Sequence, residues 1–311
     1  MYSRWFNVTV VVLWLATMSW LVMAKVLPLL AIGEPPSLPE IVESQVDNPP
    51  VGWVILIDNQ RLGWALTETK LQESGMRDMR GRVHFDKLPL GKIMPGWLKP
   101  LSQLVGRSVN ELRIDARSVL TVDALGHLLC FESAMRLDPP DEVIGMSGFM
   151  EGGQLRLVIR TGYASFTKEL RLPSKALPSD FFSPQTTLPG LYEGRTWTAP
   201  VYSPLWPSKN PLKIIRAAVE GMEPILWNGA MENVWMVVYR NDTGSASDGD
   251  RTQQGKVWVR RDGAVLRQQA RFSNSTITFV RMTERQAAEL VESAGKRWWT
   301  PESGAWMEYH D

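Results

Sequence analysis

The sequence has very few of the cysteines and histidines from which disulfides and zinc centres are built. It contains one cysteine, Cys130, and three histidines in 311 residues. A single cysteine forms no intramolecular disulfide and no thiolate cluster. Zinc sites need three or four convergent ligands, and no histidine has a second ligand at metal spacing. The apolar neighbours Leu129 and Phe131 predict that Cys130 is a packed, unreactive thiol. We therefore expect no metal and no cofactor.

An excess of charge of either sign is also missing, because 34 Lys and Arg face 33 Asp and Glu. Binding to phosphate backbones needs a basic excess, so no nucleic-acid partner is expected. The sequence has no G-x-S-x-G, no P-loop and no dinucleotide-binding glycine pattern. Since it carries no catalytic constellation, we expect a protein that is not an enzyme. An enzyme of unknown class stays open as a third reading, which a pocket joining carboxylates to His84 or His127 would support.

One long apolar run stands at the amino terminus, from Trp5 to Ala24, between Arg4 and Lys25. Twenty residues at about 1.5 Å each span roughly 30 Å as a helix, the thickness of a bilayer's hydrocarbon core. The run therefore predicts a transmembrane helix, in which residues 5–24 bind the membrane. A cleaved signal peptide is the alternative, but the residues before Lys25 fit a small-x-small cleavage site poorly.

The flanking charges predict an orientation in the membrane. Arg4 and the amino terminus precede the apolar run, whereas Lys25 alone follows it, ahead of several glutamates. The positive-inside tendency then favours a cytoplasmic amino terminus. We expect a single-pass cell-membrane protein whose larger part lies outside the cytoplasm, in the periplasm.

Composition divides the chain into four parts. They are the transmembrane anchor at 1–32, a linker at 33–50, an extracytoplasmic antiparallel β domain at 51–293, and a tryptophan-containing tail at 294–311. The linker holds five prolines and little apolar periodicity. Proline fixes φ and removes a donor, so we expect a semi-extended spacer there.

Alternating apolar and polar residues dominate the β domain. They predict strands at 51–57, 62–69, 82–88, 110–122, 127–138, 143–150, 154–161, 164–172, 195–201, 212–220, 222–228, 232–240, 256–261, 264–272 and 275–282. Asn228-Gly229 and Asp262-Gly263 are hairpin signals, the second of type I′. Helical spacing predicts a short helix at 95–105, and a capping box at Thr283 opens a terminal helix.

These features predict a mainly β (α+β) fold with one or two short helices in addition to the N-terminal one. Four of them resemble the β-rich bacterial envelope domains that share the half-barrel of periplasmic lipoprotein carriers and receptors, the LolA/LolB-like fold. They are the hairpin at 60–64, the strand pairs at 148–160, the approach to a strand at 190–195 and the strand-turn-strand at 256–267. The resemblance covers about 50–282. It is a pattern of strands and turns, so it transfers no functional residue. It implies a strongly curved antiparallel sheet around a helix, with an apolar concavity that accepts acyl chains in the carriers.

The predicted function is therefore binding by an anchored envelope domain. Its half-barrel would bind an apolar ligand, either a lipid or a lipoprotein-like molecule, or an envelope partner. The candidate ligand-binding residues are apolar side chains of the strands: Trp53, Trp64, Leu155, Leu157, Ile159, Ile277 and Phe279. The alternative is a non-catalytic scaffold that docks a partner through the tryptophan-containing tail or the proline-rich segment 173–212.

Overall fold

The described chain is a single large sheet with few helices. The computed structural model describes residues 4–21, 33, 35–36, 38–46, 48–89, 111–138, 142–161, 164–171, 177–178, 184–202, 212–241, 253–272, 275–295 and 298–299. Within them the chain forms one sheet of 15 strands and the helices α1, α3 and α6. The prediction of a mainly β fold is confirmed.

The strands form two meanders along the chain. The first contains β1 (Val51–Ile57), β2 (Gln60–Leu71), β3 (Arg77–Pro89), β4 (Glu111–Val122), β5 (Leu128–Asp138), β6 (Glu142–Glu151), β7 (Gln154–Thr161) and β8 (Ala164–Arg171). The second contains β9 (Leu177–Pro178), β10 (Thr196–Tyr202), β11 (Leu212–Trp227), β12 (Ala230–Asn241), β13 (Gln253–Val259), β14 (Val265–Phe272) and β15 (Ser275–Arg281). Neighbouring strands are antiparallel, except that β9 is parallel to β10.

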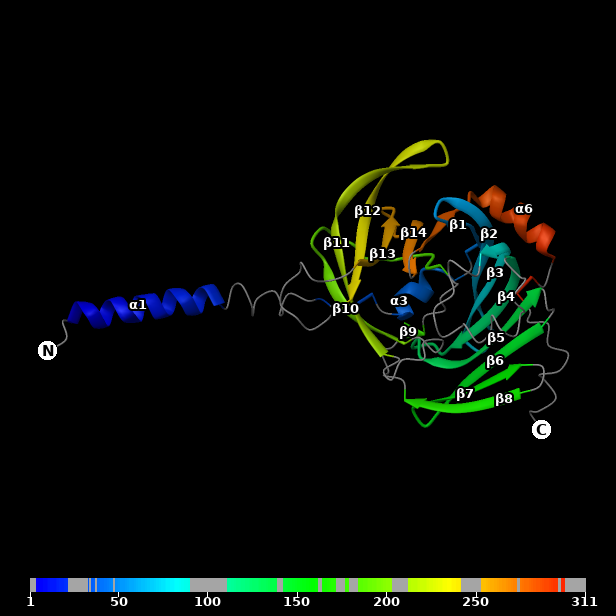
Figure 1. Cartoon of the computed structure of the whole chain (residues 1–311), viewed down its shortest axis with the longest axis horizontal. Helices are drawn as coiled ribbons and strands as arrows, with labels where there is room; N and C mark the ends of the chain where they lie inside the picture. Colours follow the sequence, from blue (N-terminus) through cyan, green and yellow to red (C-terminus); the bar gives the residue numbers. More distant parts are fainter. Residues whose placement is uncertain are drawn as a thin grey trace.

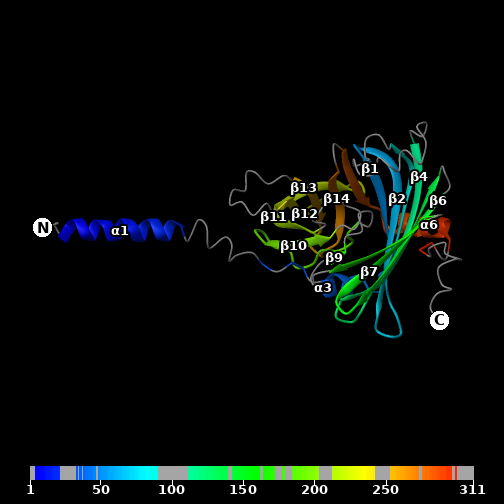
Figure 2. The ribbon, with the colours of Figure 1, turned by 60° about the horizontal axis from the view of Figure 1, so that its bottom comes forward.

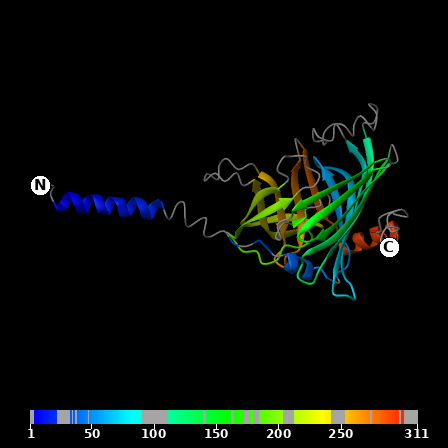
Figure 3. The same cartoon turned by 90° about the horizontal axis from the view of Figure 1, so that it is seen from below.

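The first and last strands join the two meanders. β1 pairs with β15, with Ile55 opposite Phe279, and the strand order runs from β8 through β1 and β15 to β9. β8 and β9 are the two ends of this order, so the sheet is not closed within the described residues. Figures 2 and 3 show that the sheet is strongly curved. A curved, open antiparallel sheet is therefore the confirmed architecture.

The main core covers one face of the sheet, which we call the inner face. It includes Trp53, Ile55, Phe85 and Phe279, each at most 3% exposed. Residues of β1 to β5 and β10 to β15 contribute to it, together with Leu188 of the connection before β10. Since successive strand residues point to opposite faces, their sequence neighbours define the outer face.

Helix α3 (Leu38–Glu43) packs inside the curve of the sheet (Figure 1). Its Ile41 and Val42 are 6% and 0% exposed. Just after it, Gln45 accepts a hydrogen bond from Thr69 of β2 at 3.0 Å and donates one to Thr187 at 2.9 Å. The sequence predicts a semi-extended spacer at 33–50, but these described residues pack against the sheet. The prolines favoured the prediction of a spacer, whereas the apolar side chains of Ile41 and Val42 bury this segment against the sheet.

Helix α1 (Arg4–Leu21) lies apart from the sheet in all three views (Figure 1). Its side chains from residue 10 to residue 21 are exposed. Among the described residues, no helix has both the length and the apolar character needed to cross a membrane. The predicted span continues to Ala24, and residues 22–24 lie outside the described part of the chain.

Helix α6 (Glu284–Ala294) packs on the outer face beside β1. The predicted capping box is confirmed, because Thr283 Oγ1 accepts from the Gln286 amide at 3.3 Å while the Thr283 amide donates to the Gln286 side chain at 3.0 Å. Gly52 permits close contact with the helix, since a Cβ there would lie 3.1 Å from that of Ala287. Beyond the helix, Trp298 is 3% exposed. The predicted helix at 95–105 and most of the tail lie outside the described residues.

The hairpin of β11 and β12 builds a second, smaller core. Asn228 and Gly229 both have positive φ, 49° and 80°, as the predicted hairpin turn requires. A bulge between Val219 and Gly221 interrupts the register with β12, and the side chain of Trp227 donates to the backbone oxygen of Arg281 at 2.8 Å. The hairpin therefore reaches across β13 and β14 to β15. The residues buried in this core are Ile225, Val234, Trp258 and Leu266.

Candidate binding site

Six of the seven predicted ligand residues lie on the inner face. Trp53 is 0% exposed, Phe279 is 3% exposed, and Ile277 is partly buried against the same core. Leu155 and Leu157 of β7 are 3% and 2% exposed, and Ile159 is partly buried. The cross-strand register places the side chains of Leu155, Leu157 and Ile159 on the same face of the sheet as the core residues of β4 and β5. These side chains are interior residues of the protein itself.

Trp64 does not join them, so its predicted grouping with Trp53 is wrong. β2 pairs with β1 such that Ala65 stands opposite Trp53, which turns Trp64 to the outer face. There its ring stacks on His84, with centroids 5.4 Å apart and planes inclined by 24°. The guanidinium carbon of Arg82 lies 5.3 Å from the centre of the same ring. The alternation of residues along β2 decides this placement.

The outer face around Trp64 carries a network of half-buried charges. Arg82 of β3 donates two hydrogen bonds to Asp115 of β4, at 2.9 and 2.5 Å. Arg117 Nε lies 3.7 Å from the same carboxylate. His84 Nδ1 is 3.9 Å from Asp115, and His84 Nε2 is 3.3 Å from Asp86. One carboxylate is thus shared by two arginines.

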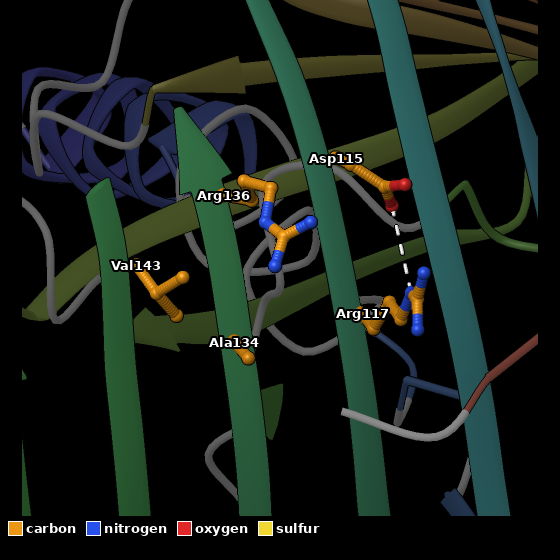
Figure 4. A pocket seen from close by; sticks show the side chains of 5 residues that line it. All are labelled: Asp115, Arg117, Ala134, Arg136 and Val143. Carbon is orange, nitrogen blue, oxygen red and sulfur yellow. Dashed lines mark ion pairs between the residues drawn. The ribbon is translucent and has the colours of Figure 1, made fainter. Parts of the chain in front are cut away.

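A small hollow opens beside this network on β4, β5 and β6 (Figure 4). Its cavity volume is about 30 Å³, which holds one or two waters rather than a drug-sized ligand. The lining residues are Asp115, Arg117, Ala134, Arg136 and Val143. Figure 4 shows Arg136 above Ala134 on the same strand and Arg117 on the neighbouring strand, with Asp115 ion-paired to Arg117.

Sheet register builds this hollow. In one cross-strand row Arg117 stands opposite Ala134, and Ala134 stands opposite Gly145. In the next row Asp115 stands opposite Arg136. Directly opposed residues share a face, so small residues form the floor while long cationic side chains rise beside it. Ala134 is 8% exposed.

Neither His84 nor His127 lines this hollow, so the described residues do not bring a histidine and carboxylates together there. His84 is close to Asp115, but its ring stacks on Trp64 and does not line the cavity. His127 sits at the turn after β4, where its Nδ1 lies 3.1 Å from Asp123. Burial is the largest single effect on the pKa of Asp123 and raises it, but the hydrogen bonds from the His127 backbone and side chain and from the Leu125 amide together outweigh it and lower the pKa. No three metal-ligating side chains converge anywhere in the described chain.

The single thiol contradicts its prediction. Cys130 is exposed, because its position in β5 turns it to the outer face opposite Thr121 and Phe149. The apolar neighbours Leu129 and Phe131 point to the other face, so the local composition was misleading.

Sequence reasoning also missed Arg117 and Arg136 as site residues. A signal was present in the predicted strand 110–122, where Arg113, Asp115 and Arg117 alternate with apolar residues and therefore share one face. Arg136 becomes part of the group only through the register between β4 and β5.

No protein-family model matches the sequence, and no curated protein matches it. Among solved structures, the chain is similar to a β-barrel-like protein of the domain of unknown function DUF1849 from Brucella abortus. The match has 9% identity and a TM-score of 0.45, and it covers 75% of this chain and 95% of that one. A DUF1089 family protein from Pseudomonas aeruginosa matches with 16% identity and a TM-score of 0.30, covering 66% and 88% of the two chains. The names of both proteins state no function.

Proposed function

We propose that this chain is a membrane-tethered envelope protein whose curved β domain acts by binding a partner, without catalysis. The observation that carries the tether is the exposed apolar surface of α1. Val10, Leu13, Trp14 and Trp20 are 48%, 65%, 56% and 71% exposed. A helix with this surface is stable when an apolar medium surrounds it.

The distribution of these side chains favours lipid over a protein groove. Val10, Val11, Val12 and Leu13 are consecutive and all exposed. At 100° per residue, four successive positions face all sides of the helix, whereas a groove contacts one stripe. The Thr17 hydroxyl contacts the backbone oxygens of Leu13 and Trp14, both at 2.9 Å. Such internal pairing lets a hydroxyl enter a bilayer.

An envelope partner is favoured over an acyl chain as the occupant of the β domain. The inner-face side chains of Trp53 and Phe279 are buried in the protein's own core. The resemblance to the LolA/LolB-like carriers supports an envelope location. The burial of these inner-face side chains among the described residues disfavours them as an open surface for acyl chains. Of the tail, Trp298 and Trp299 are disfavoured as free docking residues, since Trp298 is buried and the guanidinium carbon of Arg80 lies 4.0 Å from the centre of the Trp299 ring.

The exposed, single Cys130 provides the test of tether and orientation. The full chain is produced in bacteria, and intact cells with a permeabilised outer membrane are treated with a membrane-impermeant maleimide. We expect Cys130 to react before the inner membrane is lysed, and Cys130→Ser to remain unlabelled. The protein should stay in the membrane pellet after an alkaline carbonate wash, whereas Leu13→Lys combined with Leu15→Lys should release it. Labelling only after lysis, or release of the unaltered chain by carbonate, would contradict the proposal.

The kind of occupant is tested on the same full chain in detergent. Organic extraction followed by mass spectrometry should find no lipid bound in a one-to-one ratio to the protein, above the lipid carried by the detergent alone. A stoichiometric acyl lipid that is lost in an inner-face variant such as Leu157→Gln would instead support the apolar-ligand function.

A further inference from the structure

The hairpin of β11 and β12 continues beyond the sheet as a two-stranded ribbon. β11 pairs with β10 only as far as Ala218, and β12 pairs with β13 only as far as Trp235. Residues 222–227 and 230–234, which we call the ribbon, therefore pair only with each other within the described chain. Figure 1 shows the end of this hairpin extending beyond β13 and β14. Because successive strand residues point to opposite sides, the ribbon has two faces with different surroundings.

One face of the ribbon covers the smaller core. Ile225 and Val234 are buried there in one cluster with Trp258. Glu223 lies on the same face, where its carboxylate accepts a hydrogen bond from the indole nitrogen of Trp258. Glu232 stands opposite Ile225 and therefore shares this face. Both acidic residues of the ribbon thus lie on its covered face.

The opposite face of the ribbon is apolar and exposed. Leu226 and Met231 stand opposite each other and are 67% and 64% exposed. Met222 is 37% exposed, and Pro224 is also exposed on this face. The structure describes every residue of the ribbon, and Asn233 is the polar side chain on this face, so the face has no acid. An apolar patch that stays exposed on a folded protein marks a contact with a partner or a membrane.

An arginine stands at the base of the exposed face. Arg261, in the turn between β13 and β14, donates to Sδ of Met222 at 3.8 Å. Its side chain is exposed, and it forms no ion pair with a carboxylate within the described part of the chain. The neighbouring Arg260, by contrast, is paired with Asp262. An apolar face with an unpaired cation at its margin is complementary to a lipid bilayer, which presents acyl chains beside phosphates.

The place where the chain enters the sheet brings the proposed membrane within reach of the ribbon. Gly33 forms a bridge with Trp197 of β10, and its amide donates to the backbone oxygen of Thr196 at 2.8 Å. β10 is the neighbour of β11 in the sheet. The chain from Leu21, the last residue of α1, to Gly33 spans at most about 43 Å. A surface held this close has an effective concentration of about millimolar, so even a weak contact with it is populated.

We propose that the exposed face of the ribbon contacts the lipid bilayer in which α1 is anchored, with Leu226 and Met231 among the acyl chains and Arg261 beside the phosphates. This contact rests on the proposed tether. A protein partner would have to supply an apolar groove with a carboxylate at its edge, whereas the tether keeps a bilayer next to β10 and β11 permanently. The ribbon is then a second attachment, and it fixes the orientation of the β domain on the membrane.

The experiment places a fluorescent reporter at the tip of the ribbon in the full chain. Cys130→Ser removes the native thiol, and Ala230→Cys gives one exposed site for a nitrobenzoxadiazole label while all apolar residues of the exposed face are kept. The chain is inserted into nanodiscs of phosphatidylcholine with or without a nitroxide on the acyl chains. The control label is attached at Leu125→Cys, a site 69% exposed in the turn between β4 and β5.

We expect the nitroxide to lower the emission of the label at Ala230→Cys at least about twofold and to change that at Leu125→Cys little, because only the ribbon enters the acyl region. Leu226→Gln combined with Met231→Gln should remove the quenching. Leu71→Gln, at another exposed apolar site, 50% exposed, should leave it unchanged. Thermal unfolding of each variant checks that the fold is retained.

Arg261→Gln provides a second test that keeps the apolar face intact. In discs that contain phosphatidylglycerol, the quenching at Ala230→Cys should increase, because the anionic headgroups attract the arginine. The increase should be lost in Arg261→Gln. This arm decides the proposal if the double glutamine variant is unfolded, and an equal increase with and without Arg261 would then contradict it.

Failure of the contact and failure of the tether give different results. A chain that does not co-purify with the discs would contradict the tether and, with it, this contact. A chain that co-purifies while the label at Ala230→Cys stays unquenched, or is quenched no more than the label at Leu125→Cys, would contradict the contact alone and leave a protein partner for the face. Emission that changes with the number of chains per disc instead of with the nitroxide would assign the face to a second copy and would also overturn the proposal.

Discussion

Arg82 on β3 holds Asp115 on β4 through two hydrogen bonds, of 2.9 and 2.5 Å. The same guanidinium donates to the backbone oxygen of Ala294, at the end of α6, at 3.4 Å, and lies over the ring of Trp64. One side chain thus joins two strands, the terminal helix and an aromatic residue. The pair therefore connects the elements that surround Trp64 on the outer face.

Removal of Asp115 should destabilise the fold more than removal of a carboxylate from an exposed pair. Asp115→Ala leaves the half-buried Arg82 without its carboxylate acceptor, and we expect a loss of about 1–3 kcal/mol in the free energy of unfolding. The control is Asp138→Ala, whose pair with Arg113 has side chains 49% and 59% exposed. That variant should lose at most about 1 kcal/mol. Urea unfolding of both variants measures the difference, and equal losses would show that the Arg82 pair has no special role.

Trp53 should contribute to the free energy of unfolding as a buried core residue does. It is 0% exposed, and its indole N–H lies 3.4 Å from Thr67 Oγ1. Trp53→Ala should lower the free energy of unfolding by about 3–5 kcal/mol, because it opens a large cavity. Leu226→Ala, at a site 67% exposed, should change it by about 0.5 kcal/mol or less. If instead Trp53→Ala were nearly neutral in urea unfolding, the inner face would be an open surface rather than a core.

Gly63 should resist substitution because of the close approach of β3. A Cβ at Gly63 would lie 2.0 Å from the backbone oxygen of His84, so the strands would have to separate. Gly63→Ala should therefore cost about 3 kcal/mol or leave the chain unfolded. At Gly148 the added Cβ meets the ring of Phe131 at 2.3 Å, and a ring can rotate away. Gly148→Ala should cost less, and the opposite order of stability in thermal unfolding would contradict this reading of the two sites.

The local sequence pattern predicted most of the strands, because apolar and polar residues alternate within each strand and Gly, Asn, Asp or Pro mark the turns between strands. The prediction 154–161 coincides with β7. A split between 220 and 222 was predicted where the chain forms one long strand, β11, since Gly221, with φ 130°, forms a bulge rather than a break. The pairing of β1 with β15 joins residues more than 200 positions apart, and no local pattern encodes it.

Placement across strands explains the errors at the candidate site. Trp64 and Trp53 looked equivalent in their own strands, but the register between β1 and β2 separates them. Arg117 and Arg136 come together through the pairing of β4 with β5. A site built on cross-strand neighbours depends on register, and register is fixed by tertiary structure. Sequence therefore located the strands without locating the site.

The turn between β13 and β14 should make the stability of the fold depend on acidic pH, through Asp262. Within this turn only Gly263 has positive φ, 89°. A type I′ turn needs positive φ at both central residues, so the predicted turn type is wrong. Asp262 stabilises the turn instead, with one oxygen accepting from Arg260 Nε at 2.9 Å and the other from the Ala264 amide at 3.0 Å. The hydrogen bond from Arg260 lowers the pKa of Asp262, against an opposing effect of burial.

A carboxylate whose pKa is lower in the folded state binds protons more weakly there than in the unfolded chain. Its contribution to stability is therefore complete above the unfolded value of about 3.9 and is lost as the pH falls through the folded value. Asp262→Asn should flatten the decline of stability below about pH 4 and should be less stable than the unaltered chain at pH 7. Urea unfolding at pH 7 and at pH 3 measures both effects, with Glu289→Gln, on the exposed face of α6, as the control. An unchanged decline in Asp262→Asn would mean that this turn does not contribute to the acid sensitivity of the fold.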